Sequence, residues 1–297
     1  MSAVEEESVA SRGTTRNKSS THSGMQIGQL LLRQGKLSEE DIRHVVVAQL
    51  KHAVRFGEAA LSLGLVNESD LTRALSTQYE YSYLRIGESN LSTELVAAYQ
   101  PFGMQAEALR SLRTMLTLRW FNDRAKTLAI VAPRSGDGCS VIAANLAILF
   151  AQLGKLTLLI DGNFRRPRQH TLFDLRPVTG LSNLLAGRVS LKEASIPIEP
   201  FDNLWVLCTG SSPPNPQELL GRVSFSRLLQ TAAASYDVVI MDAPPFMEYA
   251  DAQIIAARAG GCLLLARRHL TAVVDIEKIK ARLQPTGTTL LGAVICG

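Results

Sequence analysis

The sequence has little cysteine: four residues in 297, far apart and without a C-x-x-C pair. This spacing excludes a disulfide framework and a zinc site built on paired cysteines, and it is typical of the reducing cytosol. No apolar run approaches the ~20 residues that a membrane-spanning helix needs. The first 24 residues also lack the apolar core of a signal peptide. We therefore expect a soluble, cytoplasmic protein with no direct membrane span.

The sequence also has no strong excess of one charge, since its formal net charge is only +4. Residues 1–100 carry 10 Lys and Arg against 12 Asp and Glu, whereas the remainder carries 21 against 15. Arg supplies 16 of those 21 cations, which indicates planar anions such as phosphates as partners. The basic residues do not form the dense stripe of a nucleic-acid-binding surface, so no nucleic-acid partner is expected.

A tandem repeat begins at Met25, after an acidic and then Ser/Thr-rich stretch. A shift of 29 residues aligns residues 27–49 with residues 56–78. Each copy predicts a short helix, a glycine that ends it, and a second helix with Ser38 or Asn67 as its N-cap. Two such copies packed together predict one small helical domain.

Short apolar runs alternate with helical patterns in the rest of the chain. The runs that predict strands are 128–132, 156–161, 204–208, 237–242, 262–267 and 290–296. Continuous apolar strands that alternate with helices indicate a parallel sheet flanked by helices, an α/β fold. The predicted parts are a disordered tail (1–24), a helical tandem-repeat domain (25–85), a linker (86–103) and an α/β domain (104–297).

The segment that follows the first predicted strand has the pattern of a phosphate-binding loop: a strand, a glycine-containing turn, and a helix whose free N–H groups attract anions. This pattern makes the domain a P-loop NTPase-type α/β domain. The candidate nucleotide-binding residues are Arg134, Gly136, Asp137, Gly138, Cys139, Ser140 and Val141. The position before Ser140 usually holds a lysine that reaches the β- and γ-phosphates, and here it is Cys139.

Two carboxylates stand where predicted strands end. Asp161 ends one strand and Asp242 ends another, at the sheet edge where α/β proteins bind ligands. Together with the Ser140 hydroxyl they predict a Mg²⁺ site that serves a bound ATP or ADP. Either aspartate alone has an ordinary alternative, the capping of the next turn, but the pair beside one glycine loop favours the metal site.

Six ordered blocks of the chain carry a resemblance to a known family. They are EALRSLR (107–113), GDGCSVIAANLA (136–147), LLIDGNFRRPRQHTLF (158–173), GLSNLLAG (180–187), PPNPQELLGR (213–222) and YDVVIMDAPP (236–245). These blocks resemble the bacterial tyrosine autokinases of capsule and exopolysaccharide systems, in particular the EpsG-type chain-length-determinant kinases. The resemblance implies transfer of the ATP γ-phosphate to tyrosine and control of polysaccharide length. It also implies a membrane-spanning co-polymerase as partner, which would hold the chain peripherally at the inner membrane.

The sequence departs from the family's pattern at several positions. The family's D-x-D-x-R-x-P motif implies catalytic roles for Asp161 and Arg165, with Asp242 from the later strand, but its second aspartate is Asn163 here. Cys139 replaces the loop lysine, and the last tyrosine of the sequence is Tyr249, where such kinases often end in a tyrosine-rich tail. We expect a degenerate or weak kinase whose Mg-nucleotide binding survives better than its catalysis. The alternatives are an inactive scaffold and a MinD/ParA-type ATPase, in which Arg134 would stand for the signature lysine.

Cys139 also admits a redox hypothesis. A thiol at a helix N-terminus near Arg134 is a candidate for a depressed pKa and high reactivity. The alternative is an inert small residue in a decayed site.

Two further patterns predict binding surfaces. Glu107, Arg110 and Arg113 have helical spacing, and the resemblance implies that this stripe joins subunits into a homo-oligomer. The N-terminal repeat resembles the cyclic di-GMP-binding domain of type II secretion and pilus ATPases. Its candidate ligand residues are Arg55, Phe56, Gly57, Gln78, Gly28 and Gln49. The first copy has lost its arginine to Gln26, so docking to a protein without cyclic di-GMP remains the alternative.

Overall fold

The computed structural model describes residues 27–79, 83–85 and 87–297, so the predicted tail lies outside the described residues. The chain divides into two compact units, Met1–Tyr81 and Ser82–Gly297. The division falls close to the end that the repeat predicts for the helical domain.

The first unit is a set of short helices around one small core. Residues 27–33 are helical. They precede α2 (Glu39–His52), α3 (Phe56–Ser62) and α4 (Glu68–Tyr79). Gly35 and Gly64 stand at equivalent positions of the two copies, and both have a φ of +67°. This left-handed conformation ends a helix and favours glycine, so the turn that the repeat predicts in each copy is confirmed.

Both longer helices of this unit begin with the predicted side-chain caps. The Asp41 backbone N–H donates to Ser38 Oγ at 3.1 Å, and the Ser38 backbone N–H donates to Asp41 Oδ2 at 2.8 Å. In the second copy the Asp70 backbone N–H donates to Asn67 Oδ1 at 2.8 Å. Lys36 then joins the two copies through a 2.9 Å ion pair with Asp70. The capped helices predicted at Ser38 and Asn67 are therefore confirmed.

The second unit is built on a seven-stranded sheet with the order β3-β4-β2-β5-β1-β6-β7. The strands are β1 (Thr127–Val131), β2 (Thr157–Asp161), β3 (Ile196–Ile198), β4 (Phe201–Leu207), β5 (Val238–Asp242), β6 (Gly261–Arg267) and β7 (Thr289–Cys296). All neighbours pair in parallel except β3, which is antiparallel to β4. The six predicted strands are confirmed, and the short edge strand β3 is an addition to them.

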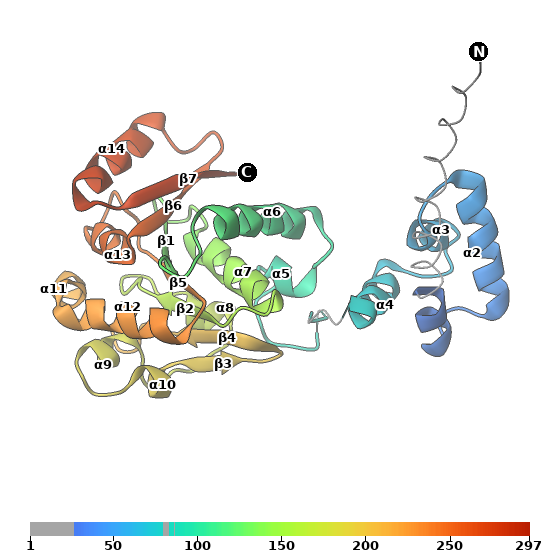
Figure 1. Cartoon of the computed structure of the whole chain (residues 1–297), viewed down its shortest axis with the longest axis horizontal. Coiled ribbons are helices and arrows are strands. Elements are labelled where there is room, and N and C mark those ends of the chain that lie inside the picture. Colours follow the sequence, from blue (N-terminus) through green and yellow to red (C-terminus); the bar gives the residue numbers. More distant parts are fainter. Residues whose placement is uncertain (1–26, 80–82, 86) are drawn as a thin grey trace, which may run out of the picture. The chain divides into compact units, whose positions relative to one another are not determined.

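Helices cover both faces of this sheet (Figure 1). The helices are α5 (Val96–Tyr99), α6 (Met104–Arg119), α7 (Cys139–Gln152), α8 (Gln169–Leu172), α9 (Leu181–Leu185), α10 (Leu191–Ala194), α11 (Pro216–Gly221), α12 (Val223–Ser235), α13 (Asp251–Ala259) and α14 (Val273–Leu283), the last followed by a 3₁₀ turn at Gln284–Thr286. The side chains of α7 pack into one core cluster with α5 and α6, and those of α12 and α13 pack into the other. Because α7 lies between the sheet and two other helices, it is apolar on nearly every side.

Residues 88–99, assigned to a linker by their polar sequence, are packed elements of the α/β unit. Leu95, Ala97 and Ala98 are fully buried in the same core cluster as α7. The Ala97 backbone N–H donates to Asn145 Oδ1 at 2.8 Å, and the Ser92 backbone N–H donates to the Leu172 carbonyl at 2.9 Å. The small and polar residues of this stretch gave no sign of burial in the sequence. The stretch is buried because its backbone hydrogen-bonds to groups that are far away along the chain.

Candidate functional site

The loop between β1 and α7 has the shape that a phosphate-binding loop requires. Gly136 and Gly138 have φ values of +87° and +90°, and no atom lies within 4 Å of the position that a Cβ would take on either, so backbone conformation alone demands glycine. Asp137 Oδ2 accepts a 2.8 Å hydrogen bond from the Arg134 backbone N–H and closes the turn. The loop therefore directs the free N–H groups at the start of α7 toward one place.

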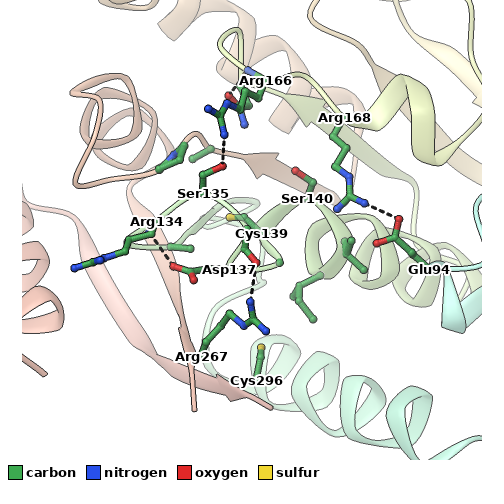
Figure 2. A pocket seen from close by; sticks show the side chains of 18 of the residues that line it. Glu94, Arg134, Ser135, Asp137, Cys139, Ser140, Arg166, Arg168, Arg267 and Cys296 are labelled. Atoms are coloured by element: carbon green, nitrogen blue, oxygen red, sulfur yellow. Dashed lines mark hydrogen bonds and ion pairs between the residues drawn. The ribbon is translucent and has the colours of Figure 1, made fainter. Parts of the chain in front are cut away.

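That place is a cavity of about 550 Å³. All seven predicted nucleotide-binding residues line it, from Arg134 to Val141. It is also lined by Glu94, Asn163, Arg166, Arg168, Arg267 and Cys296. Figure 2 shows that the labelled side chains come from the loop, the Glu94 segment, the segment after β2, and the ends of β6 and β7. The cavity has the size and the cationic lining of a nucleotide site.

The two predicted carboxylates meet below this cavity. Asp161 and Asp242 are direct neighbours in the register of β2 and β5, and both are fully buried. The backbone N–H groups of Asn163, Arg168 and Gln169 donate to Asp161 at 3.0–3.1 Å. Asp242 Oδ2 accepts a 2.8 Å bond from Gln169 Nε2, whereas its Oδ1 is buried without a partner.

Burial raises the pKa of both carboxyl groups, and their mutual repulsion adds to the effect for Asp161. The nearby Ser140 hydroxyl lowers the pKa of Asp242 and so partly opposes the rise that burial causes. A hard divalent cation suits this donor set, because it would satisfy the orphaned Asp242 oxygen and neutralise the pair. No group of three or more His, Cys, Asp or Glu side chains suited to a metal occurs among the described residues. The other ligands of a Mg²⁺ ion would therefore be phosphate, hydroxyl and water oxygens.

Cys139, which occupies the lysine position, is partly buried and lines the cavity. Its Sγ–H donates to the Ile130 carbonyl at 2.9 Å. Burial, reinforced by Asp242, raises the pKa of the thiol well above its ordinary value. The redox hypothesis needs a depressed pKa, and the raised pKa of this thiol argues against it.

Arg165, to which the resemblance gives a catalytic role, does not line the cavity. Its Nε bonds Asp251 Oδ2 at 3.0 Å, and its guanidinium lies 4.8 Å from the centre of the Tyr249 ring. Asn163 does line the cavity, and its Oδ1 accepts a 3.0 Å bond from the Arg166 backbone N–H. The motif thus contributes Asp161 and Asn163 to the site and sends its arginine elsewhere.

Sequence reasoning missed several residues of the site. Arg267 directly follows the apolar run of β6, so its place at the carboxyl edge of the sheet was a usable signal. Gln169 joins Asp242 to the Ser140 carbonyl through bonds of 2.8 and 3.1 Å, which no local pattern indicates. Glu94 was hidden because its segment reads as a linker.

The three residues of the predicted oligomerisation stripe lie on α6 and differ in their exposure. Glu107 is exposed and pairs with Arg110 at 2.8 Å, while Arg110 also donates to the Pro101 carbonyl. Arg113 Nη1 donates to the Leu149 carbonyl at 3.1 Å, near the end of α7. The two arginines therefore make contacts within the unit, and of the three residues Glu107 faces solvent most fully.

The candidate cyclic di-GMP residues of the first unit lie partly in its core. Gly28 packs under the ring of Phe56, and Gly57 packs under Leu71, so a Cβ at either glycine would meet those side chains at 3.0 Å or less. Phe56 itself is buried. Arg55 is exposed and Gln49 half-buried, whereas the side chains of Gln78 and Gln26 lie outside the described part. The glycines of the repeat thus have a packing explanation.

A glycine loop that opens onto a helix, two carboxylates at neighbouring strand ends, and a mostly parallel sheet together define a P-loop NTPase-like fold. The protein-family models that were compared do not match the chain. Tyrosine-protein kinase YwqD of Bacillus subtilis is 36% identical over 209 residues, which are 70% of this chain and 88% of that protein. The putative tyrosine-protein kinase CapB of Staphylococcus aureus is 34% identical over 196 residues, 66% of this chain and 86% of that protein.

The solved structures agree with these relatives. The kinase domain of the Escherichia coli tyrosine kinase ETK matches with a TM-score of 0.66 and 28% identity, covering 74% of this chain and 92% of that domain. The chain therefore belongs to the family of bacterial tyrosine-protein kinases. The cell division ATPase MinD of Pyrococcus furiosus matches with a TM-score of 0.51 at 22% identity, which concerns the fold alone. In the described part of the chain, no helix has both the length and the apolarity to cross a membrane.

Proposed function

We propose that the chain is a Mg-nucleotide-binding member of its kinase family with degenerate or weak tyrosine kinase activity. The observation that carries the proposal is the orphaned, buried Oδ1 of Asp242, which stands beside Asp161 under a glycine loop whose lysine is replaced by Cys139. The loop and the carboxylates suit a Mg-nucleotide, while the missing lysine removes a charge that stabilises phosphoryl transfer.

Each group of this site has a defined task in the proposal. The N–H groups at the start of α7 bind phosphate oxygens, and Ser140 and Asp242 hold Mg²⁺, with Asp161 holding or accepting a proton nearby. When bound, Mg²⁺ supplies charge neutralisation at the phosphates. Asn163 orients a water or hydroxyl group by hydrogen bonding and adds no negative charge. Binding is therefore preserved better than transfer.

For the biological role, we propose control of chain length in exopolysaccharide synthesis or export. Membership of the bacterial tyrosine-protein kinase family supports this role, and the relatives include one named for a cps region in Klebsiella pneumoniae. A membrane-spanning co-polymerase is the proposed partner, and it would hold the protein at the inner membrane. Self-association through the exposed face of α6 is proposed as well.

For the first unit we propose a docking role, with cyclic di-GMP as its candidate ligand. Exposed Arg55 supports contact with a phosphate, and exposed Val46, Val47 and Leu50 of α2 support contact with an apolar partner. Calorimetric titration of cyclic di-GMP into the full chain and into Arg55→Ala separates the two roles. Binding of cyclic di-GMP to the wild type that is lost in Arg55→Ala supports the ligand-binding role. No binding to the wild type supports a docking role without this ligand.

The activity is tested by incubating the full chain with Mg-ATP and following phosphotyrosine. We expect slow or undetectable labelling in the wild type and a gain of about tenfold or more in Cys139→Lys, which restores the loop cation. Cys139→Ala is the control, because it removes the thiol without adding a charge, and it should stay at the wild-type rate. Brisk labelling by the wild type that Asp161→Ala abolishes would contradict the degenerate character.

A further inference from the structure

A phosphate loop without its lysine needs another cation near the start of α7, because the β- and γ-phosphates carry several negative charges. Four arginines line the cavity and are candidates: Arg134, Arg166, Arg168 and Arg267. Their contacts differ, and the difference selects one of them.

Three of the arginines make contacts with other residues around the cavity. Arg134 Nη2 pairs with Asp275 Oδ2 at 3.1 Å, a carboxylate that is itself nearly buried. Arg166 Nη1 donates to Ser135 Oγ at 2.9 Å, and Arg267 Nη1 lies 3.5 Å from the Gly136 carbonyl. Figure 2 shows these side chains around the loop rather than over Ser140.

Arg168 is fixed to the metal-binding end of the site through its backbone. Its N–H donates to Asp161 Oδ2 at 3.0 Å, and the next residue, Gln169, bonds both Asp242 and the Ser140 carbonyl. The positive charge of Arg168 also lowers the pKa of Asp242, as expected of a cation close to the acidic pair. Of the four arginines, this one bonds Asp161 through its own backbone and directly precedes the residue that bonds Asp242 and α7.

We propose that Arg168 binds nucleotide phosphate in place of the loop lysine, and that Glu94 competes with the phosphate for it. This inference rests on the proposed nucleotide binding. Arg168 Nη2 lies 2.6 Å from Glu94 Oε1, and both side chains are close to half exposed, at 44% and 46%. A pair so open to water is readily exchanged, since its net contribution to stability is small.

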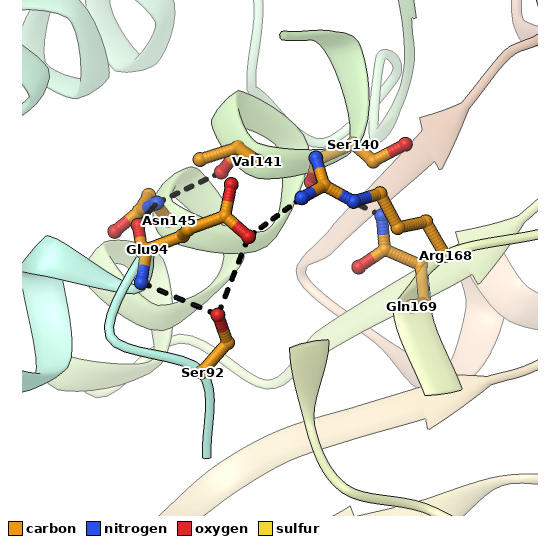
Figure 3. Close-up of polar contacts among 7 residues, drawn as sticks. All are labelled: Ser92, Glu94, Ser140, Val141, Asn145, Arg168 and Gln169. Carbon is orange, nitrogen blue, oxygen red and sulfur yellow. Dashed lines mark hydrogen bonds and ion pairs between the residues drawn. The ribbon is translucent and has the colours of Figure 1, made fainter. Parts of the chain in front are cut away.

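Glu94 is held in place independently of Arg168 (Figure 3). Its carbonyl accepts a 3.0 Å bond from Asn145 Nδ2 of α7, and its N–H donates to Ser92 Oγ at 3.3 Å. Asn145 is itself buried. When a phosphate draws Arg168 away, Glu94 therefore stays at the rim of the cavity as a negative charge that has lost its ion pair and keeps the 3.4 Å hydrogen bond from Ser92 Oγ. The pair acts as a latch that favours the nucleotide-free site.

If the pair acts as this latch, nucleotide affinity should depend on the charges of Glu94 and Arg168 and not on the shape of their side chains. Phosphate oxygens carry more charge than one carboxylate, so the competition strengthens with each phosphate that reaches Arg168. Removing the Glu94 charge should tighten binding of Mg-ATP and Mg-ADP and leave AMP nearly unchanged. Removing the Arg168 charge should weaken the same two ligands.

The experiment is calorimetric titration of Mg-ATP, Mg-ADP and AMP into the full-length protein and its variants. We expect Glu94→Gln to lower the Kd for Mg-ATP about threefold to tenfold, and Arg168→Gln to raise it about tenfold or more. Arg168→Lys should retain most of the affinity, and the double variant should match Arg168→Gln. Glu88→Gln is the matched control, because it breaks the 3.1 Å ion pair with Arg85 in the same segment but does not line the cavity.

A second comparison ties Arg168 to the missing lysine. In a Cys139→Lys background, Arg168→Gln should cost clearly less affinity than in the wild type, because the restored lysine supplies the same charge. Wild-type binding with unchanged affinity in both Arg168→Gln and Glu94→Gln would overturn the latch and leave the proposed function standing. Absence of nucleotide binding in the wild type would overturn the proposed function, and the latch with it.

Discussion

At the residue scale, the acidic pair is a feature that weakens the fold in order to serve the site. Asp161 and Asp242 lie side by side without solvent, and one Asp242 oxygen has no partner. Such groups are destabilising when charged, because desolvation and mutual repulsion both oppose ionisation. The raised pKa of each group means that the native state holds a proton that the unfolded chain releases above about pH 4. Stability should therefore fall as the pH rises from that value through the raised native pKa.

Asp242→Asn tests this consequence directly. The amide keeps an acceptor for Gln169 and removes the charge, so the free energy of unfolding should rise by roughly 1–3 kcal/mol at pH 7.5 without Mg²⁺. The gain should shrink toward pH 4, where the wild-type pair is already protonated. Urea unfolding at several pH values measures it, with exposed Asp202→Asn as the control. A variant less stable than the wild type at pH 7.5 would contradict the assignment.

At the element scale, α7 joins the loop, the sheet and the segment that precedes α6. Asn145 makes this connection: its side chain bonds the Ala97 N–H, the Glu94 carbonyl and the Val141 carbonyl at 2.8–3.0 Å. A buried backbone group whose hydrogen bond depends on one side chain is costly to leave without a partner. The position of the Glu94 segment should therefore depend on this single amide.

Asn145→Ala should lower the free energy of unfolding by about 2–4 kcal/mol, because the buried Ala97 N–H and the partly buried Glu94 carbonyl lose their partner. Denaturant unfolding of the full chain measures the loss. Gln230→Ala, an exposed change on α12, is the control and should stay within about 0.5 kcal/mol of the wild type. A loss no larger than in the control would show that the segment is held by other contacts.

The sequence patterns predict the strands of this protein more completely than the residues of its site. The apolar runs predicted all six parallel strands because buried parallel strands need continuous apolar residues. The loop and Asp161 and Asp242 were predictable because strand ends of a parallel sheet share one edge. Glu94 and Gln169 were not, because their roles come from contacts 51 and 73 residues away in sequence. The position of Arg165 outside the cavity was not predictable for the same reason, since it bonds Asp251, 86 residues away in sequence.

At the scale of the whole molecule, the exposed face of α6 is the surface proposed for self-association. Met104 is 91% exposed and Leu118 is 81% exposed, and Met115 and Glu107 lie on the same helical stripe. Apolar side chains gathered in a stripe indicate an interaction site more than scattered ones do. Arg110 and Arg113 make contacts within the unit. The apolar stripe, with Glu107 at its edge, is therefore the surface that we propose for contact with a second copy.

Leu118→Glu should therefore weaken self-association, because it places a charge in the proposed contact. Sedimentation velocity over a concentration series measures the effect, and we expect the dissociation constant to rise at least tenfold, about 1.4 kcal/mol. Val178→Glu is the matched control, a similarly exposed apolar residue away from α6. Equal behaviour of the two variants, or a monomeric wild type, would contradict the proposed surface.

The central claim is that a phosphate loop without lysine still binds a Mg-nucleotide through its backbone and its buried carboxylates. Calorimetric titration of ADP into the full chain, with and without Mg²⁺, tests it most directly. We predict binding at one site per chain that requires Mg²⁺ and is lost in Asp242→Asn, although that variant is folded and more stable. No heat of binding at millimolar ADP with Mg²⁺, or equal binding by Asp242→Asn, would contradict it.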